Sequence, residues 1–296
     1  MEMRDTQPGL GRSAAIGAVC LLAFGPVIVK KVEIAVTAFV FWRLLFSAIP
    51  LAVFLFASRR RIAWADVRHA VLGGFVFGLN LMVGVHSLRR TSALHHMVIM
   101  SFQPLAVLLV SIKFFGERPR LPVYLYSLAA FGGVALTLTA ADASGVASFS
   151  GNIFSVVAML LFTLYFASSK KARESLDSLT YQLLLVLVAL ATVFPFMLVS
   201  EKGIPVPSGN DWFLVVAMAL IPGTGHLLTN FAHGHIPLSF VGLMNLGFTA
   251  VAPLYTWWLI GEGIGGVQAI GTGIVLTSLA MIVSKTRNPS VEHPAS

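Results

Sequence analysis

The sequence predicts an all-α integral membrane protein whose ten transmembrane helices form two inverted five-helix repeats. Of its 296 residues, 57% are hydrophobic and only 11% are charged, with a mean hydropathy of +0.86. A soluble domain carries about 25% charged residues, so too few charges are present to cover a water-facing surface. Unbroken apolar runs exclude a β-barrel, whose strands alternate polar and apolar residues. The two halves of the chain also match each other.

Polar or turn-rich segments divide the chain into ten apolar segments. Each is close to the roughly 20 residues that cross a hydrocarbon core of about 30 Å. The predicted spans are 13–29, 34–57, 67–87, 92–115, 122–141, 151–169, 179–200, 212–232, 237–260 and 266–284. The first lacks a small-residue cleavage site followed by a soluble domain, so we interpret it as a retained helix.

The basic residues support this count and give an orientation. With a cytoplasmic N-terminus, fourteen of the 20 Lys and Arg residues lie on the cytoplasmic side, five lie outside, and Arg43 lies within a span. This bias follows the positive-inside rule. It predicts a multi-pass protein of the cytoplasmic (inner) membrane with both termini in the cytoplasm. Topology also explains the net charge of +8, which therefore does not indicate nucleic-acid binding.

The halves overlay at an offset of 145 residues, which sets Gly116-Glu117 on Gly261-Glu262 and Pro50 on Pro195. The repeat unit contains five spans. Because five is odd, the second copy enters the membrane in the opposite sense, as in many transporters whose substrate site lies near the midplane between repeats. The predicted units are 12–141 and 149–284, with cytoplasmic tails at 1–11 and 285–296.

Several segments resemble a known family: Phe24-Gly25 through Lys30-Lys31, Trp42-Arg43-Leu44, and Pro104 followed by Phe115-Gly116-Glu117-Arg118. The chain resembles the ten-helix branch of the drug/metabolite transporter superfamily, with two EamA-type domains over roughly 12–284. The resemblance implies carrier-type transport, often export of amino acids or related metabolites, and fixes no substrate. The sequence departs from the family at Thr249, where a proline is usual, and at Val188, where an arginine is usual. We therefore expect the second half to bend differently.

Polar groups within the hydrocarbon are costly and usually face a cavity or a partner. Arg43 lies mid-span, where it could be the counter-ion of a substrate carboxylate or could donate to helix-end carbonyls. The second interpretation predicts that Arg43→Ala lowers stability.

The eighth span has the clearest pattern. His226, Asn230 and His233 share one helix face by their i, i+4, i+7 spacing, and Pro222, Gly223 and Gly225 could allow local unwinding there. We predict that this face lines the central pathway on its cytoplasmic half. The alternative is a hydrogen-bonded seam between helices.

The fourth span places His96 and Gln103 on one face, and the ninth places Asn245 and Thr249 on an equivalent face. Asn80 and Tyr165 are further candidates. Each of these side chains could instead form an ordinary interhelical hydrogen bond. The predicted substrate-binding set is His226, Asn230, His96, Gln103, Asn245, Asn80, Tyr165 and Arg43.

No Asp or Glu lies well inside a span, which argues against fixed-cation substrates. The predicted function is a secondary carrier that moves a small metabolite, an amino acid or a related zwitterionic or anionic compound, by alternating access, with export favoured. Beyond substrate and lipids, we expect no cofactor, metal or catalytic residue. Proton coupling through a histidine such as His226 and a homodimer stay open. The alternatives are an intramembrane enzyme, for which no His-Glu-x-x-His or Gly-x-Ser-x-Gly motif is found, and a channel or receptor.

The charge bias gives a topology prediction. A reporter fused after Ser290 should read as cytoplasmic, and one inserted within 204–210 should read as external, because fourteen basic residues then lie on the cytoplasmic side. Paired alkaline phosphatase and fluorescent protein fusions measure this. The reverse readout at both positions would contradict the predicted orientation.

Overall fold

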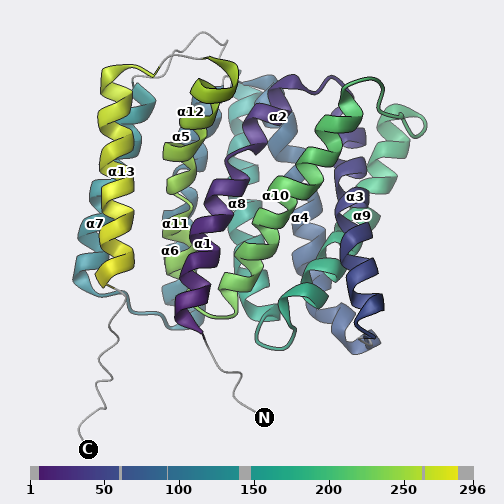
Figure 1. The fold of residues 1–296 in the computed structure, drawn as a ribbon, viewed down its shortest axis with the longest axis horizontal. Helices are drawn as coiled ribbons and strands as arrows, with labels where there is room; N and C mark the ends of the chain where they lie inside the picture. Colours follow the sequence, from purple (N-terminus) through teal and green to yellow (C-terminus); the bar gives the residue numbers. More distant parts are fainter. Residues whose placement is uncertain (1–6, 60–61, 92, 140–147, 262–263, 286–296) are drawn as a thin grey trace, which may run out of the picture.

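The computed structural model describes residues 7–59, 62–91, 93–139, 148–261 and 264–285, which contain helices and no strand (Figure 1). Within these ranges ten spans are long and apolar enough to cross a membrane. Seven are single helices: α3 (Val36–Ala57), α4 (Trp64–Arg90), α7 (Leu121–Thr139), α8 (Phe149–Ala172), α9 (Ser178–Glu201), α10 (Asp211–His233) and α13 (Gly266–Lys285). The predicted fold class is therefore confirmed.

The other three spans are interrupted. They are α1 (Pro8–Leu22) with α2 (Gly25–Lys31), α5 (Ala93–Met100) with α6 (Gln103–Phe115), and α11 (Leu238–Met244) with α12 (Gly247–Ile260). Pro26 and Pro104 follow the first two interruptions, and a proline cannot donate the helical hydrogen bond to the preceding turn. The third interruption occurs at the position equivalent to the second, although Thr249 replaces the proline. Both spans are thus interrupted at this level, with or without the proline.

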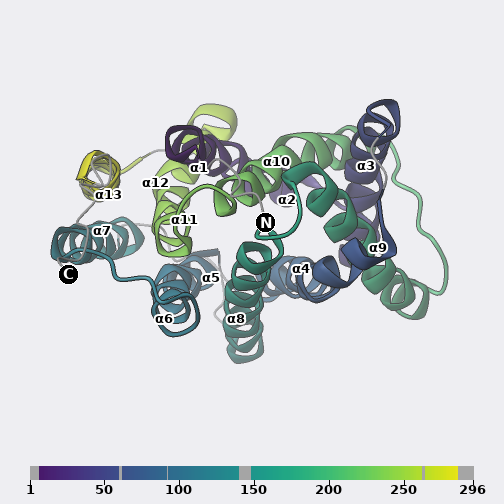
Figure 2. The ribbon, with the colours of Figure 1, turned by 90° about the horizontal axis from the view of Figure 1, so that it is seen from below.

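The packing follows the inverted repeat. Helix α4 packs along α8. In the repeat α4 corresponds to α10 and α8 to α1, and α10 and α1 pack against each other in the same way. Helices α3 and α9 form a symmetric pair, as do α7 and α13, which stand at one side of the bundle (Figure 2). Helix α1 begins and helix α13 ends at the same end of the bundle, here called the terminal end (Figure 1). Helix α8 begins at the opposite, distal end (Figure 1).

Glycines allow the closest helix contacts. A Cβ at Gly74 would lie 2.8 Å from the carbonyl oxygen of Leu185, and one at Gly78 would lie 3.0 Å from that of Ala189. The i, i+4 glycine pair on α4 is therefore a close-packing face against α9, as small-xxx-small motifs are in membranes.

The two Gly-Glu endings have a conformational cause. Gly116 and Gly261 cap α6 and α12 with φ of 64° and 78°, the left-handed region that glycine adopts without strain. The Glu117 carboxylate then accepts hydrogen bonds from the backbone N–H groups of Leu238 (2.6 Å) and Ser239 (2.9 Å) at the start of α11. Glu262 lies outside the described residues.

The main difference from the predicted boundaries is at the start. Helix α1 begins at Pro8, so part of the predicted tail 1–11 is helical. Residues 1–6 and 286–296 of the predicted tails lie outside the described ranges.

The α7–α13 contact gives a stability prediction. A Cβ at Gly133 would lie 2.8 Å from the Gly271 carbonyl oxygen and 2.9 Å from Ile274 Cγ2. Gly133→Val should therefore destabilise the fold by about 1–3 kcal/mol through overpacking. A Cβ at the neighbouring Gly132 would meet no atom within 4 Å, so Gly132→Val is the matched control. Detergent-solubilised yield and thermal midpoint are the measurements; equal midpoints for the two variants would contradict the close packing.

Candidate functional site

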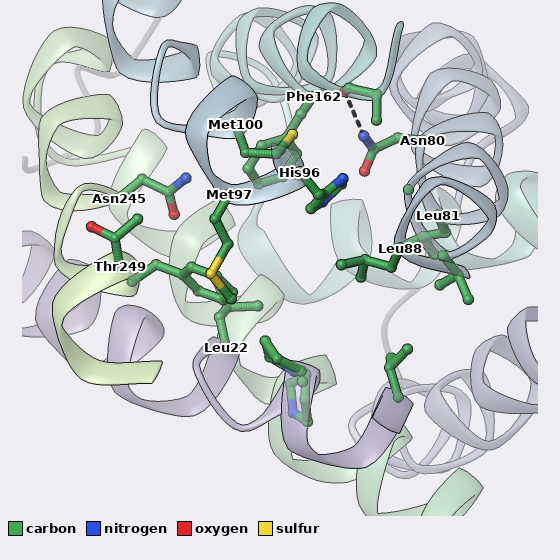
Figure 3. Close-up of a pocket in the computed structure, with 18 of the residues that line it drawn as sticks. Leu22, Asn80, Leu81, Leu88, His96, Met97, Met100, Phe162, Asn245 and Thr249 are labelled. Atoms are coloured by element: carbon green, nitrogen blue, oxygen red, sulfur yellow. Dashed lines mark hydrogen bonds between the residues drawn. The ribbon is translucent and has the colours of Figure 1, made fainter. Parts of the chain in front are cut away.

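A cavity of about 200 Å³ lies between the two halves (Figure 3). Its wall is mostly apolar, with Met97, Met100 and Phe162 among the largest side chains. The polar residues on the wall are Arg43, Asn80, His96, Ser101, His226, Asn245 and Thr249. Among the described residues, no Asp or Glu lines it.

The interruptions of all three broken spans border this cavity. Gly25 and Pro26 reach it from the first span, Ser101 and Pro104 from the fourth, and Asn245 from the ninth. Helix α4 contributes its later turns through Leu88, and α2 contributes Val29. The cavity therefore extends from the middle of the bundle toward the distal end.

Arg43 contributes a formal positive charge to the cavity wall. Its side chain is buried, with 3% of its surface exposed, and its Nε atom has no hydrogen-bond partner among the described residues. The expected alternative, donation to helix-end carbonyls, is not observed within the described ranges; Ser47 Oγ instead donates to the Arg43 carbonyl at 2.8 Å, within α3. Its repeat equivalent, Val188, carries no charge, so the charge belongs to one half only.

His226 lies on the same cavity wall as Arg43. Its ring packs edge-on against Phe77, with 4.8 Å between centroids. The Nδ1 atom is buried without a partner among the described residues. Helix α10 is continuous around His226, contrary to the expected unwinding, and Gly225 instead allows close packing against α1, where a Cβ would lie 2.8 Å from Leu22 Cγ.

His96 is held by two serines that the sequence analysis did not single out. Its Nδ1 atom lies 3.0 Å from Ser87 Oγ and 3.1 Å from Ser155 Oγ, and both serines are fully buried. Because α4 and α8 supply the serines and α5 supplies the histidine, this contact fixes the ring at the junction of three helices. The sequence signal that could have identified Ser87 and Ser155 is their polarity within apolar spans.

The wall amides also bond to the protein. Asn80 Nδ2 donates to the Ala158 carbonyl at 2.8 Å (Figure 3). Asn245 Nδ2 donates to Gln103 Oε1 at 3.1 Å, which joins the interruptions of the fourth and ninth spans. Gln103 itself is fully buried behind this contact.

Asn230 and Tyr165 lie away from the cavity wall, in a buried seam. Tyr165 Oη donates to Asn230 Oδ1 at 3.2 Å, and Asn230 Nδ2 donates to Gln182 Oε1 at 2.6 Å. Neither Asn230 nor Tyr165 has exposed surface. In this conformation the structure therefore differs from the predicted pathway face: His226 reaches the cavity, and Asn230 belongs to the alternative, a hydrogen-bonded seam. Gln182, which was not predicted from the sequence, completes this hydrogen-bonded seam.

The seam continues to the terminal end. Lys170 Nζ donates to the carbonyls of His233 (2.9 Å) and Ile236 (2.8 Å), and Arg173 Nε donates to that of Asn230 (2.8 Å). Cations at a helix C-terminus interact favourably with its dipole, so α8 anchors the end of α10. His233 is buried here against Phe166, and neither ring nitrogen has a partner among the described residues.

No group of three or more His, Cys, Asp or Glu side chains that could hold a metal ion occurs within the described ranges. The single cysteine, Cys20, is partly buried and free.

Comparison with known proteins agrees with this architecture. The profile of the EamA-like transporter family matches residues 9–139 and, separately, residues 149–284. A solved structure, titled only as the crystal structure of a protein, superposes with a TM-score of 0.76 at 15% identity, covering 94% of this chain and 97% of that one; this likeness shows the fold. No curated protein matches the chain.

Proposed function

Because the chain belongs to the EamA-like transporter family, we propose that it is a secondary carrier for a small metabolite bearing a carboxylate, such as an amino acid or a related zwitterionic or anionic compound. It would work by alternating access in the cytoplasmic (inner) membrane. The direction proposed is export, which rests on the family resemblance.

One observation carries the carboxylate assignment. Arg43 lines the cavity, is 3% exposed, and has an Nε without a partner among the described residues. A buried charge without a partner is strongly destabilising, and a guanidinium fits a carboxylate through paired hydrogen bonds. A substrate carboxylate would supply the missing partner. The lack of an acidic residue among the described wall residues disfavours a substrate that is only a cation.

The volume limits the substrate's size. Drug-sized ligands occupy pockets of about 300–1,000 Å³, and this cavity is about 200 Å³. A molecule of amino-acid size therefore suits it, with the methionine and phenylalanine side chains of the wall providing adaptable apolar contact.

The first test concerns Arg43. Comparing metabolites released by cells with and without the gene should identify a carboxylate-bearing substrate. Arg43→Met should then weaken its binding by about tenfold or more, since charge-assisted hydrogen bonds contribute about 1.5–3 kcal/mol. Because Arg43 Nε has no partner to lose among the described residues, the thermal midpoint of the substrate-free protein should not fall.

Arg89→Met is the matched control. Arg89 lies on α4 outside the cavity and donates to the Ile34 carbonyl at 2.8 Å, so its loss should leave substrate affinity unchanged. Unfolding of Arg43→Met, or undiminished binding of the identified carboxylate, would contradict the proposed role.

The second test separates a carrier from a channel by thiol labelling in a Cys20→Ala background. Met97 lines the cavity, so a cysteine there should react with an impermeant reagent added at the distal side. His233 is buried toward the terminal end and, among the described residues, donates no side-chain hydrogen bond. A cysteine at 233 should react from the terminal side only when the protein alternates, and substrate should change the two rates in opposite directions.

Leu228 is the control position, because it packs against α1 near Gly17. A cysteine at 228 should stay unreactive from both sides. If cysteines at 97 and 233 both reacted fast at every substrate concentration, the result would indicate a continuous channel.

A further inference from the structure

Oxygen atoms gather on the cavity wall where the interruptions of the fourth and ninth spans meet. Asn245 and Thr249, one turn apart, lie side by side there (Figure 3). Ser101, from the interruption of the fourth span, also lines the cavity. These groups are neutral, and they belong to the same wall as Arg43.

Three of their four hydrogen-bond donor protons are already used within the protein. Asn245 Nδ2 donates to Gln103 Oε1 at 3.1 Å, Thr249 Oγ1 to the Leu246 carbonyl at 2.7 Å, and Ser101 Oγ to the Val98 carbonyl at 2.6 Å. A hydroxyl has one proton and two lone pairs, and an amide oxygen has two lone pairs. What remains for a ligand is therefore mostly acceptors, together with the second N–H of Asn245 Nδ2.

The backbone also offers a hydrogen-bond acceptor at this place. Pro104 has no N–H to give to the carbonyl of Met100. In the ninth span the N–H groups of Phe248 and Thr249 bond three residues back, to Asn245 and Leu246, so the regular helical pattern is broken beside Asn245. Gln103 Nε2, which has no partner among the described residues, is buried and out of reach of a ligand.

We propose that Asn245 Oδ1, Thr249 Oγ1 and Ser101 Oγ form a subsite for a protonated amine of the substrate, opposite in polarity to Arg43. This rests on the proposed function and narrows it, from any carboxylate to a zwitterion. An ammonium group offers three donors and no acceptor, and oxygens at interrupted membrane helices bind cations in this way. A free Na⁺ would use the same oxygens, so the experiment must separate the two.

Thermal stabilisation of the purified protein in detergent measures binding without knowledge of the transported compound. The probes are leucine, methionine and phenylalanine, each with its des-amino acid and its amide, in sodium-free buffer and again with Na⁺ alone. We expect at least one amino acid to bind about tenfold more tightly than its des-amino acid, as loss of a charge-assisted hydrogen bond requires.

The variants are Thr249→Val, which keeps the side-chain shape, and Asn245→Leu. Each should reduce the preference for the amino acid over its des-amino acid and leave the affinity for the des-amino acid unchanged. Asn152→Leu is the control: Asn152 lies outside the cavity and accepts a hydrogen bond from Thr91 at 2.8 Å. It should keep the full preference.

The outcomes are distinct. Equal binding of amino acid and des-amino acid, or stabilisation by Na⁺ that Thr249→Val abolishes, would overturn the amine subsite and leave the carboxylate assignment standing. Binding of the amide as tightly as the acid would overturn the role of Arg43. If no probe stabilised the protein, both the amine subsite and the carboxylate role of Arg43 would be overturned for apolar amino acids.

Discussion

The structure depends on the need to satisfy backbone hydrogen bonds where water is absent. In hydrocarbon an unpaired N–H or C=O is so costly that lipid-facing segments must stay helical. Seven of the ten described spans are single helices, although Pro50, Pro195 and Pro222 each remove one helical hydrogen bond within them. The three interruptions all border the cavity, at Gly25, Ser101 and Asn245. The breaks between helices thus lie beside the cavity, which couples the position of the site to the interrupted spans.

The inverted repeat supplies the frame, and departures from it supply the chemistry. The interruptions of the fourth and ninth spans occupy equivalent positions, and glycine ends both spans in the left-handed conformation. The charge is not duplicated, because Arg43 is matched by Val188. The first span is interrupted before Pro26, whereas its equivalent α8 is continuous. A cavity with one cationic side can orient a dipolar ligand, which a fully symmetric cavity could not.

Periodic and compositional features were predictable from the sequence. Span number, repeat and glycine packing follow from hydropathy, offset and spacing, which are local signals. The site was only partly predictable. His226 and Asn230 share a helix face, yet His226 lines the cavity and Asn230 bonds to Gln182, a distinction that depends on a partner from α9. The break in the ninth span was missed because no proline marks it; there, hydrogen bonds three residues back replace those four residues back.

The buried polar atoms toward the terminal end bear on how the proposed carrier could alternate between two conformations. Opening the terminal half would break the Tyr165–Asn230–Gln182 bonds, and each net hydrogen bond contributes about 0.5–1.5 kcal/mol. Opening would also let water reach the ring nitrogens of His233, which are buried without partners among the described residues at a cost of about 1–3 kcal/mol each. These contributions oppose each other and have similar size. A carrier needs such a balance, because a substrate can shift the equilibrium only by its difference in affinity for the two states.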